Sequence, residues 1–105
     1  MKPIIMRAKD LKGNDFNSNE FEKFSIALVK HNSNSRLGLD PESDVAYYIL
    51  KGKATWIINN KEYLVSKGDL VFLPKGTKYK KKTKNLLMLA ISSPRFDRKK
   101  RVYFE

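Results

Sequence analysis

Short apolar runs separated by turn residues recur along almost the whole chain, and no segment shows the apolar periodicity of a capped amphipathic helix. Short strands spaced about 8–12 residues apart are typical of an all-β sandwich or barrel. The sequence therefore predicts an all-β fold. The best candidate for a short helical turn is the Asn-rich segment 15–24.

The turn residues divide the chain into ten expected strands. We expect them at residues 4–6, 24–30, 37–39, 45–50, 54–58, 62–65, 70–73, 79–83, 86–92 and 101–104. Asn59 and Asn60 are expected to form a two-residue hairpin turn, because Asn tolerates the positive φ that such a turn requires. Gly52 is expected to end the strand at 45–50.

Several of the expected strands are apolar on both faces, notably residues 24–30, 45–50 and 86–92. One face of each strand can point into a barrel. The other face must be covered by a second sheet or by a second subunit. In a chain of 105 residues we favour the second subunit, and we predict a homodimer.

The net charge of +11 comes entirely from the second half of the chain. Residues 1–50 contain equal numbers of basic and acidic side chains, whereas residues 51–105 contain fifteen Lys or Arg against four Asp or Glu. A field of one sign favours anionic partners such as nucleic acid, phosphorylated metabolites or an acidic protein. A solvated lysine-rich surface without any partner is the alternative.

Other features of the composition exclude several classes of protein. The chain has no Cys, so it has neither disulfides nor zinc–thiolate sites. No apolar run approaches the roughly 20 residues of a membrane-spanning helix, and the apolar stretch at residues 1–7 is too short for a secretory signal. We therefore expect a cytoplasmic protein without a membrane partner.

Two motifs lie in the middle of the chain. Residues 45–52 read VAYYILKG and precede the hairpin, and residues 68–76 read GDLVFLPKG and combine two turns with a fixed spacer. From about Leu37 to Pro94 the chain resembles the cupin family of small double-stranded β-barrels. The resemblance implies a jelly-roll barrel in a single domain of residues 1–105, with a core barrel over about residues 24–94 and edge strands at both ends.

The same resemblance implies that the usual metal site is lost. Cupins hold a divalent metal through two His and one Glu of the first motif and one His of the second. The matching positions here are Gly38, Asp40, Val45 and Tyr79. Of these only Asp40 has a ligating group, whereas a first-row metal needs at least three such groups. The only histidine, His31, lies outside both motifs. We therefore expect no metal and no other cofactor.

Strand alternation, placed by the resemblance, points Tyr47, Tyr79 and Lys81 into the barrel, together with either Trp56 or Ile57. Aromatic rings with hydrogen-bonding groups suit sugars, bases and other ring-shaped ligands. An inward Lys81 would meet a phosphate or carboxylate. We predict a ligand site made of Tyr47, Trp56, Tyr79 and Lys81. The alternative is a filled interior in which Tyr79 plugs the vacated metal site.

Several functions remain open. The favoured one is binding of a small anionic or sugar-like ligand, with Asp40 at the rim. A metal-independent sugar isomerase or epimerase would need a proton-transfer group, for which Tyr79 and Asp40 are the candidates. A dimerisation or interaction module with a basic surface is the third, because cupin domains of centromere proteins also place Tyr at the position of Tyr79. Nucleic-acid binding through Lys80 and Lys82 ranks lower, because alternation sends Lys81 to the opposite face.

Overall fold

A computed structural model of the protein describes residues 18–20, 23–95 and 97–104. The strand expected at residues 4–6 lies outside this part of the chain. Within it, no helix has the length and apolar character needed to cross a membrane.

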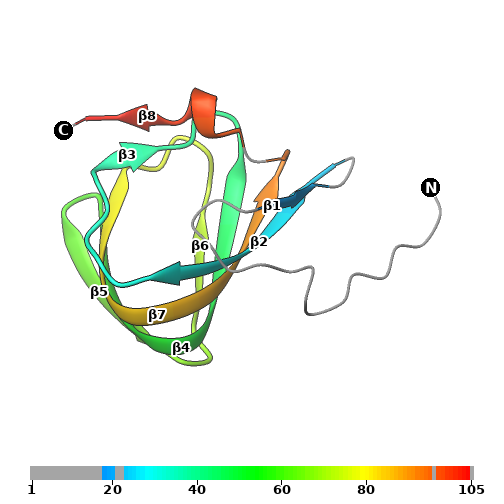
Figure 1. The fold of residues 1–105 in the computed structure, drawn as a ribbon. Helices are drawn as coiled ribbons and strands as arrows, with labels where there is room; N and C mark the ends of the chain where they lie inside the picture. Colours follow the sequence, from blue (N-terminus) through cyan, green and yellow to red (C-terminus); the bar gives the residue numbers. More distant parts are fainter. Residues whose placement is uncertain (1–17, 21–22, 96, 105) are drawn as a thin grey trace.

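The described residues form one antiparallel sheet of eight strands, which confirms the all-β prediction (Figure 1). The strands are β1 (Ser18–Glu20), β2 (Ser25–His31), β3 (Gly38–Leu39), β4 (Asp44–Ile58), β5 (Lys61–Ser66), β6 (Leu70–Leu73), β7 (Tyr79–Ser93) and β8 (Val102–Tyr103), with a 3₁₀ turn, η2, at Arg98–Lys100. The helical turn expected within residues 15–24 is wrong where the structure describes that segment. Residues 18–20 pair with residues 25–27 of β2, so their backbone groups bond across a ladder.

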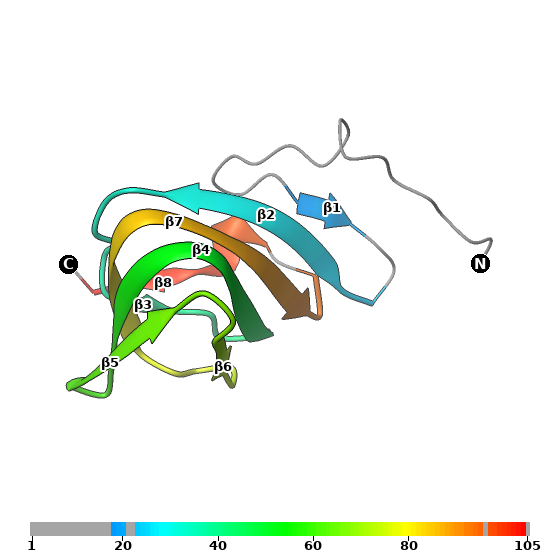
Figure 2. The ribbon, with the colours of Figure 1, turned by 90° about the horizontal axis from the view of Figure 1, so that it is seen from below.

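The centre of the sheet is the pair formed by β4 and β7, which run antiparallel from Asp44 opposite Ser93 to Ile58 opposite Tyr79. The other edge of β4 pairs with β6 and β5, and the other edge of β7 pairs with β2 and β3. β3 in turn pairs with β8. Figure 2 shows β2, β7 and β4 side by side as strongly curved strips, which wrap the sheet around a common interior.

A corner near Gly52 produces this curvature. The sequence predicts that a strand ends there, but β4 continues through it, because β7 continues alongside with only a shift in register between Ile49 and Lys53. Gly52 has a φ of 87°, and a Cβ at this position would collide with the carbonyl group of Asn85. Glycine therefore lets two backbones approach closely at the bend. Past the corner, the inward positions of β4 change from odd to even numbers.

The predicted hairpin between β4 and β5 is confirmed. Asn59 and Asn60 have φ values of 50° and 67°, as a type I′ turn requires, and the flanking Ile58 and Lys61 are paired. This short turn holds β5 against the second half of β4.

The apolar core lies inside the curled sheet. It consists of the inward side chains Ala27, Val29, Val45, Tyr47, Ile49, Ala54, Trp56, Val71, Leu73, Tyr79, Leu86 and Met88. Trp56 has no exposed surface, whereas its neighbour Ile57 is half-buried on the other side of the strand. Of the two side chains that the sequence left open, Trp56 is therefore the one that points inward.

Candidate functional site

A pair of tyrosines occupies the barrel interior. Tyr47 comes from β4 and Tyr79 from the first position of β7, and both are buried. Their hydroxyl oxygens lie 2.8 Å apart, which is a hydrogen bond. Burial, and then the adjacent Tyr79, raise the pKa of Tyr47 well above its usual range. Tyr47 is therefore a neutral phenol that can donate or accept a hydrogen bond at any physiological pH.

Trp56 forms a wall beside this pair. Its ring centroid lies 5.4 Å from that of Tyr47, and the two ring planes are tilted by 45°. The indole Nε1 is buried and has no hydrogen-bond partner among the described residues. A buried donor without a partner costs about 1–3 kcal/mol. Such a group is a candidate contact for a ligand.

Lys81 brings a positive charge into the same interior. Only 7% of this residue is exposed, and its Nζ lies 5.8 Å from the ring centroid of Tyr47, 5.9 Å from that of Trp56 and 6.0 Å from that of Tyr79. The Lys81 backbone is fixed on both sides, because its N–H donates to Ser35 Oγ at 2.9 Å and its carbonyl accepts from Ser35 N at 2.8 Å. The structure thus brings all four residues of the predicted ligand site together.

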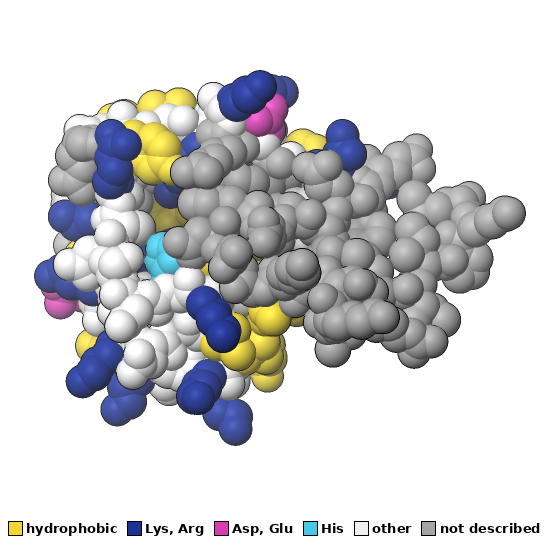
Figure 3. Space-filling view, in the orientation of Figure 1, with side chains coloured by type: hydrophobic (Ala, Val, Ile, Leu, Met, Phe, Trp, Pro, Cys, Tyr) yellow, Lys and Arg dark blue, Asp and Glu magenta, His cyan; other side chains and the backbone are white. Residues whose placement is uncertain are grey.

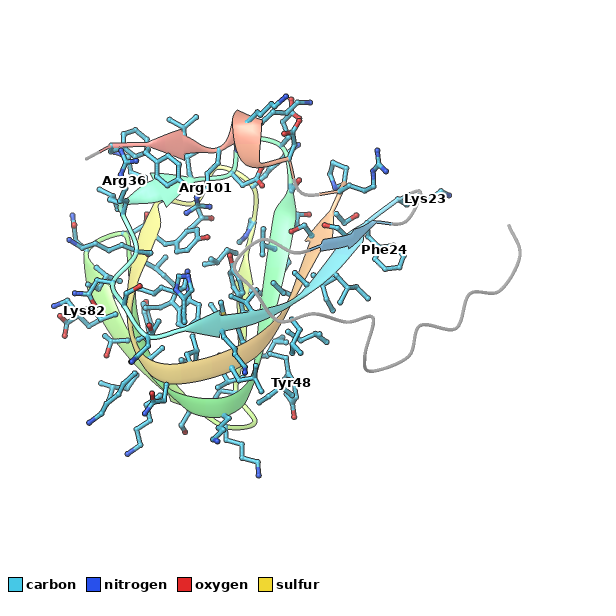
Figure 4. The ribbon with its side chains drawn as sticks, in the orientation of Figure 1. Lys23, Phe24, Arg36, Tyr48, Lys82 and Arg101 are labelled. Carbon is cyan, nitrogen blue, oxygen red and sulfur yellow. The ribbon has the colours of Figure 1, made fainter. Side chains whose placement is uncertain are left out.

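The neighbouring lysines face away from this interior. Lys82 is exposed and lies outside the ring of strands, and Lys80 is half-buried (Figure 4). The basic run at residues 80–82 is therefore divided between the two faces of β7, as alternation predicts. On the face shown in Figure 3, Lys and Arg side chains are spread around the margin of the molecule and do not form one dense patch.

A second cation, Arg101, reaches the tyrosine pair from the C-terminal segment. Figure 4 shows its side chain pointing into the ring of strands. Its Cζ lies 4.7 Å from the ring centroid of Tyr79 and 5.3 Å from that of Tyr103. Sequence reasoning did not find this residue, because its place depends on the pairing of β8 with β3, which lie far apart in the chain.

Gly38 makes room for this segment. A Cβ at Gly38 would lie 2.7 Å from the carbonyl oxygen of Val102 and 3.4 Å from Nη2 of Arg101. The first of these distances is shorter than van der Waals contact allows, so a larger residue would push the C-terminal segment away. The sequence signal for this docking is Gly38 itself, a glycine at a position where cupins have a metal ligand.

Asp40 does not lie at the rim as the sequence predicts. It is buried, with 6% of its surface exposed, and its Oδ1 accepts hydrogen bonds from the backbone N–H groups of Glu42 and Ser43, both at 2.9 Å. Such bonds are typical of an Asp that stabilises a turn. One of its carboxylate oxygens is thus engaged by the backbone of the loop before β4.

The residues at the family's metal positions do not fit a divalent ion. Gly38 and Val45 have no side-chain atom that can bind a metal, and one carboxylate oxygen of Asp40 is hydrogen-bonded to the backbone of the following turn. Tyr79, paired with Gly38 across the ladder, carries the Arg101 guanidinium over its ring. In the part of the chain that the structure describes, no three His, Cys, Asp or Glu side chains are grouped as metal ligands.

The comparison with protein families agrees with this architecture. The model of the cupin domain (Cupin_2) matches residues 31–85, which is more than half of the chain. The chain belongs to the cupin family. The fold predicted from the two motifs is thereby confirmed, and this small cupin carries a guanidinium and a lysine in its interior. No curated protein sequence gives a significant match.

Solved structures share the fold of this cupin at low sequence identity. A protein from Planctomyces limnophilus has a TM-score of 0.79 and 14% identity, over 97% of each chain. Pac13 from Streptomyces is described as a nucleoside dehydratase, and its tyrosine-to-phenylalanine variant solved with uridine has a TM-score of 0.63 and 15% identity, over 90% of this chain and 89% of its own. A putative sugar phosphate isomerase from Acidithiobacillus ferrooxidans has a TM-score of 0.60 and 26% identity, over 68% of this chain and 50% of its own.

Proposed function

We propose that the interior of this cupin barrel binds a small anionic ligand with a sugar-like or base-like ring, without the help of a metal ion. The observation that carries the proposal is the convergence of Lys81 and Arg101 on the hydrogen-bonded pair of Tyr47 and Tyr79. These two cations come from β7 and from the segment before β8, so the fold brings them together.

The site is rich in side chains that donate hydrogen bonds. Lys81, Arg101 and the Trp56 indole can only donate hydrogen bonds, and one oxygen of the nearby Asp40 carboxylate is already engaged by the backbone. Within the described residues, no carboxylate forms an ion pair with the half-buried Arg101. Taking the Arg101 guanidinium out of water is costly unless an anion offsets the loss of hydration. A phosphate or carboxylate is the ligand group that complements such a site.

The aromatic walls favour a ring in the ligand. Tyr47, Trp56 and Tyr79 offer flat apolar faces next to the cations, an arrangement that suits a sugar or a base. Two proteins of the same fold are described with such ligands or substrates, one as a putative sugar phosphate isomerase and one as a nucleoside dehydratase in complex with uridine. These likenesses support the ligand class, while the cations argue for its charge.

A second candidate function is a metal-independent isomerase or epimerase. The hydroxyl pair of Tyr47 and Tyr79 favours it, because a proton donor and a proton acceptor lie side by side among buried side chains. Tyr79 is then the proton-transfer group. The two functions separate cleanly, since Tyr79→Phe abolishes turnover under the second and weakens binding only modestly under the first.

The test is calorimetric titration and thermal unfolding with a panel that separates charge from ring. The panel holds inorganic phosphate, glucose 6-phosphate, uridine, uridine monophosphate and galacturonate. A ligand present at about 100 times its dissociation constant should stabilise the fold by about 2.7 kcal/mol. We expect the charged ring compounds to bind, and uridine to bind more weakly than its monophosphate.

Matched lysine variants locate the site. Lys81→Met should reduce the affinity for the charged ligand at least tenfold, whereas Lys82→Met, one residue along the same strand but on its outer face, should leave it unchanged. Equal effects of the two variants, or no binding of any panel member, would exclude an anion site inside the barrel. NMR of the same mixtures detects isomerisation and so tests the enzyme alternative.

A further inference from the structure

The side chains of the candidate site are closed off from solvent. The exposed fraction is at most 8% for each of Tyr47, Trp56, Tyr79 and Lys81, and Trp56 has no exposed surface at all. A ligand of the size proposed above can therefore reach these side chains only after some segment of the barrel has moved aside.

β8 is weakly attached to the rest of the sheet. It pairs only with β3, at two positions, and β3 in turn pairs with β7 only where Gly38 lies opposite Tyr79. Figure 1 shows β3 and β8 crossing the top of the ring of strands. An ion pair between Lys100 and Glu42 also holds this end of the chain, but both side chains are exposed and such pairs contribute little.

The apolar side chains of the C-terminal segment, residues 97–104, add little burial. The exposed fractions are 41% for Val102, 37% for Tyr103 and 46% for Phe104. One further backbone bond runs from the N–H of Phe104 to the carbonyl of Leu37. Segments with few buried apolar contacts and few protected hydrogen bonds open first in a folded protein. By contrast, β4 and β7 are paired along their whole length.

Positive charges gather around the same segment. The guanidinium carbons of Arg36 and Arg101 lie 4.5 Å and 5.3 Å from the ring centroid of Tyr103. Lys78 Nζ lies 4.2 Å from the ring centroid of Phe104. Two like charges on one ring repel each other, and an anion bound next to Arg101 would offset this repulsion. The closed position of the segment is therefore favoured more strongly when an anion is bound.

We propose that the C-terminal segment is the entrance to the barrel, which detaches from β3 to admit a ligand and closes again with Arg101 on the ligand's anionic group. The closing step rests on the proposed function, whereas the opening is a property of the ligand-free chain. Arg101 thereby determines specificity. A neutral ligand of the same shape gains the ring contacts but does not favour the closed state, and only differential affinity for one state shifts a conformational equilibrium.

A disulfide between β3 and β8 tests the entrance without any ligand. Leu39 and Val102 are paired, and opposite residues of an antiparallel ladder have Cα atoms about 4.5–5.5 Å apart, which suits a disulfide. The chain has no Cys, so Leu39→Cys/Val102→Cys can form only this bond. Trp56 is the only tryptophan, and acrylamide quenching of its fluorescence measures access to the interior. We expect oxidation to lower the quenching constant about fivefold or more, and reduction with dithiothreitol to restore it.

The matched control is Thr55→Cys/Leu64→Cys, a pair that joins β4 to β5 away from the C-terminal segment. Its oxidation should leave the quenching of Trp56 unchanged. Equal quenching in oxidised and reduced Leu39→Cys/Val102→Cys would overturn the proposal, since the entrance would then lie elsewhere. Hydrogen exchange of the wild type is a second test that needs no variant. The proposal fails if the amide of Phe104 exchanges as slowly as the paired amides of β4 and β7.

Uridine monophosphate and uridine test the closing step. Saturating uridine monophosphate should slow the exchange of the Phe104 amide about tenfold in the wild type, whereas uridine should not, and Arg101→Gln should lose the effect. Uridine monophosphate should also enter the oxidised Leu39→Cys/Val102→Cys protein at least about tenfold more slowly than the reduced protein. Equal association rates would overturn the entrance. If no charged ring compound bound while the disulfide still protected Trp56, the entrance would stand and the proposed ligand class would be wrong.

Discussion

The hydroxyl oxygens of Tyr47 and Tyr79 lie 2.8 Å apart inside the barrel, and this contact joins the first half of β4 to the first residue of β7. The two tyrosines are 32 residues apart in sequence. Their hydrogen bond therefore forms only because the sheet curls around its interior and brings the two side chains together. Because Lys81 and Arg101 both lie near these rings, the pair also sets the chemistry of the site.

Removal of one hydroxyl should change how stability depends on pH. The pKa of Tyr47 is raised in the folded protein, chiefly by burial and then by Tyr79. The folded state therefore keeps this proton more tightly than the unfolded chain does. The stabilisation is fully present below the unfolded pKa of about 10 and is lost as the pH rises above that value. Wild-type stability should fall steeply on the alkaline side.

Urea unfolding of Tyr47→Phe from about pH 8 to about pH 11 checks this prediction. Near neutral pH the variant should be about 1–3 kcal/mol less stable, because it loses a buried hydrogen bond. Above about pH 10 the difference should shrink, because the variant lacks the group whose proton is lost. Tyr63→Phe, at an exposed position on β5, should follow the wild type. If the stability of the wild type and of Tyr47→Phe changed with pH in parallel, the alkaline loss of stability would not come from Tyr47.

The corner of the barrel depends on Gly52. Gly52→Ala should cost about 3 kcal/mol or more, because a Cβ meets the Asn85 carbonyl and because a positive φ disfavours alanine by about 1–2 kcal/mol. Gly76→Ala is the control, since Gly76 has a φ of 81° but open space at its Cβ position. Gly76→Ala should lose only the roughly 1–2 kcal/mol that a positive φ costs an alanine. Chemical unfolding gives both values, and equal costs would mean that close backbone approach contributes nothing.

Much of the fold could be predicted because local chemistry determines it. Turn residues such as Asn59 and Asn60 determine the hairpin by their own backbone preferences. Strand alternation correctly predicted that Lys81 and Lys82 point to opposite faces of the sheet. The continuity of β4 and β7 could not be predicted in the same way. Gly52 has the local signature of a strand end, and only the partner strand alongside it makes the chain continue.

In the candidate site, too, some residues are placed by their own strand and others only by contacts between distant segments. Tyr47, Tyr79 and Lys81 follow from strand alternation once the resemblance to the cupin family fixes which face points inward, so the sequence could place them. Arg101 lies in the site only because β8 docks on β3, a contact between two-residue strands with weak sequence signals. Asp40 was misplaced for a related reason, since its bonds to the following turn depend on backbone conformation.

Gly38 should control the position of Arg101. In Gly38→Ala the new Cβ would meet the carbonyl oxygen of Val102, so the C-terminal segment should detach from β3. The backbone N–H of Phe104 donates to the carbonyl of Leu37 at 2.9 Å in the wild type. Its hydrogen exchange should accelerate in the variant, while the exchange of β4 and β7 stays slow. Affinity for the charged ligand should fall as it does in Arg101→Gln. Unchanged protection of Phe104 would show that the segment tolerates the methyl group.

Salt dependence should distinguish the interior site from the basic outer surface. A phosphate held inside the barrel by Lys81 and Arg101 is shielded from mobile ions, whereas exposed charges are largely screened beyond about 8 Å at physiological ionic strength. We expect the affinity for uridine monophosphate to change less than about tenfold between low and physiological salt. An oligonucleotide bound through exposed lysines such as Lys82 and Lys84 should lose affinity by about a thousandfold or more for six or more phosphate contacts.

Fluorescence titration with each ligand, in the wild type, Lys81→Met and the double variant Lys82→Glu/Lys84→Glu, compares the two modes of binding. If the double variant weakened the nucleotide as strongly as Lys81→Met does, the ligand would lie on the outer surface, and the buried lysine would serve only the packing of the barrel.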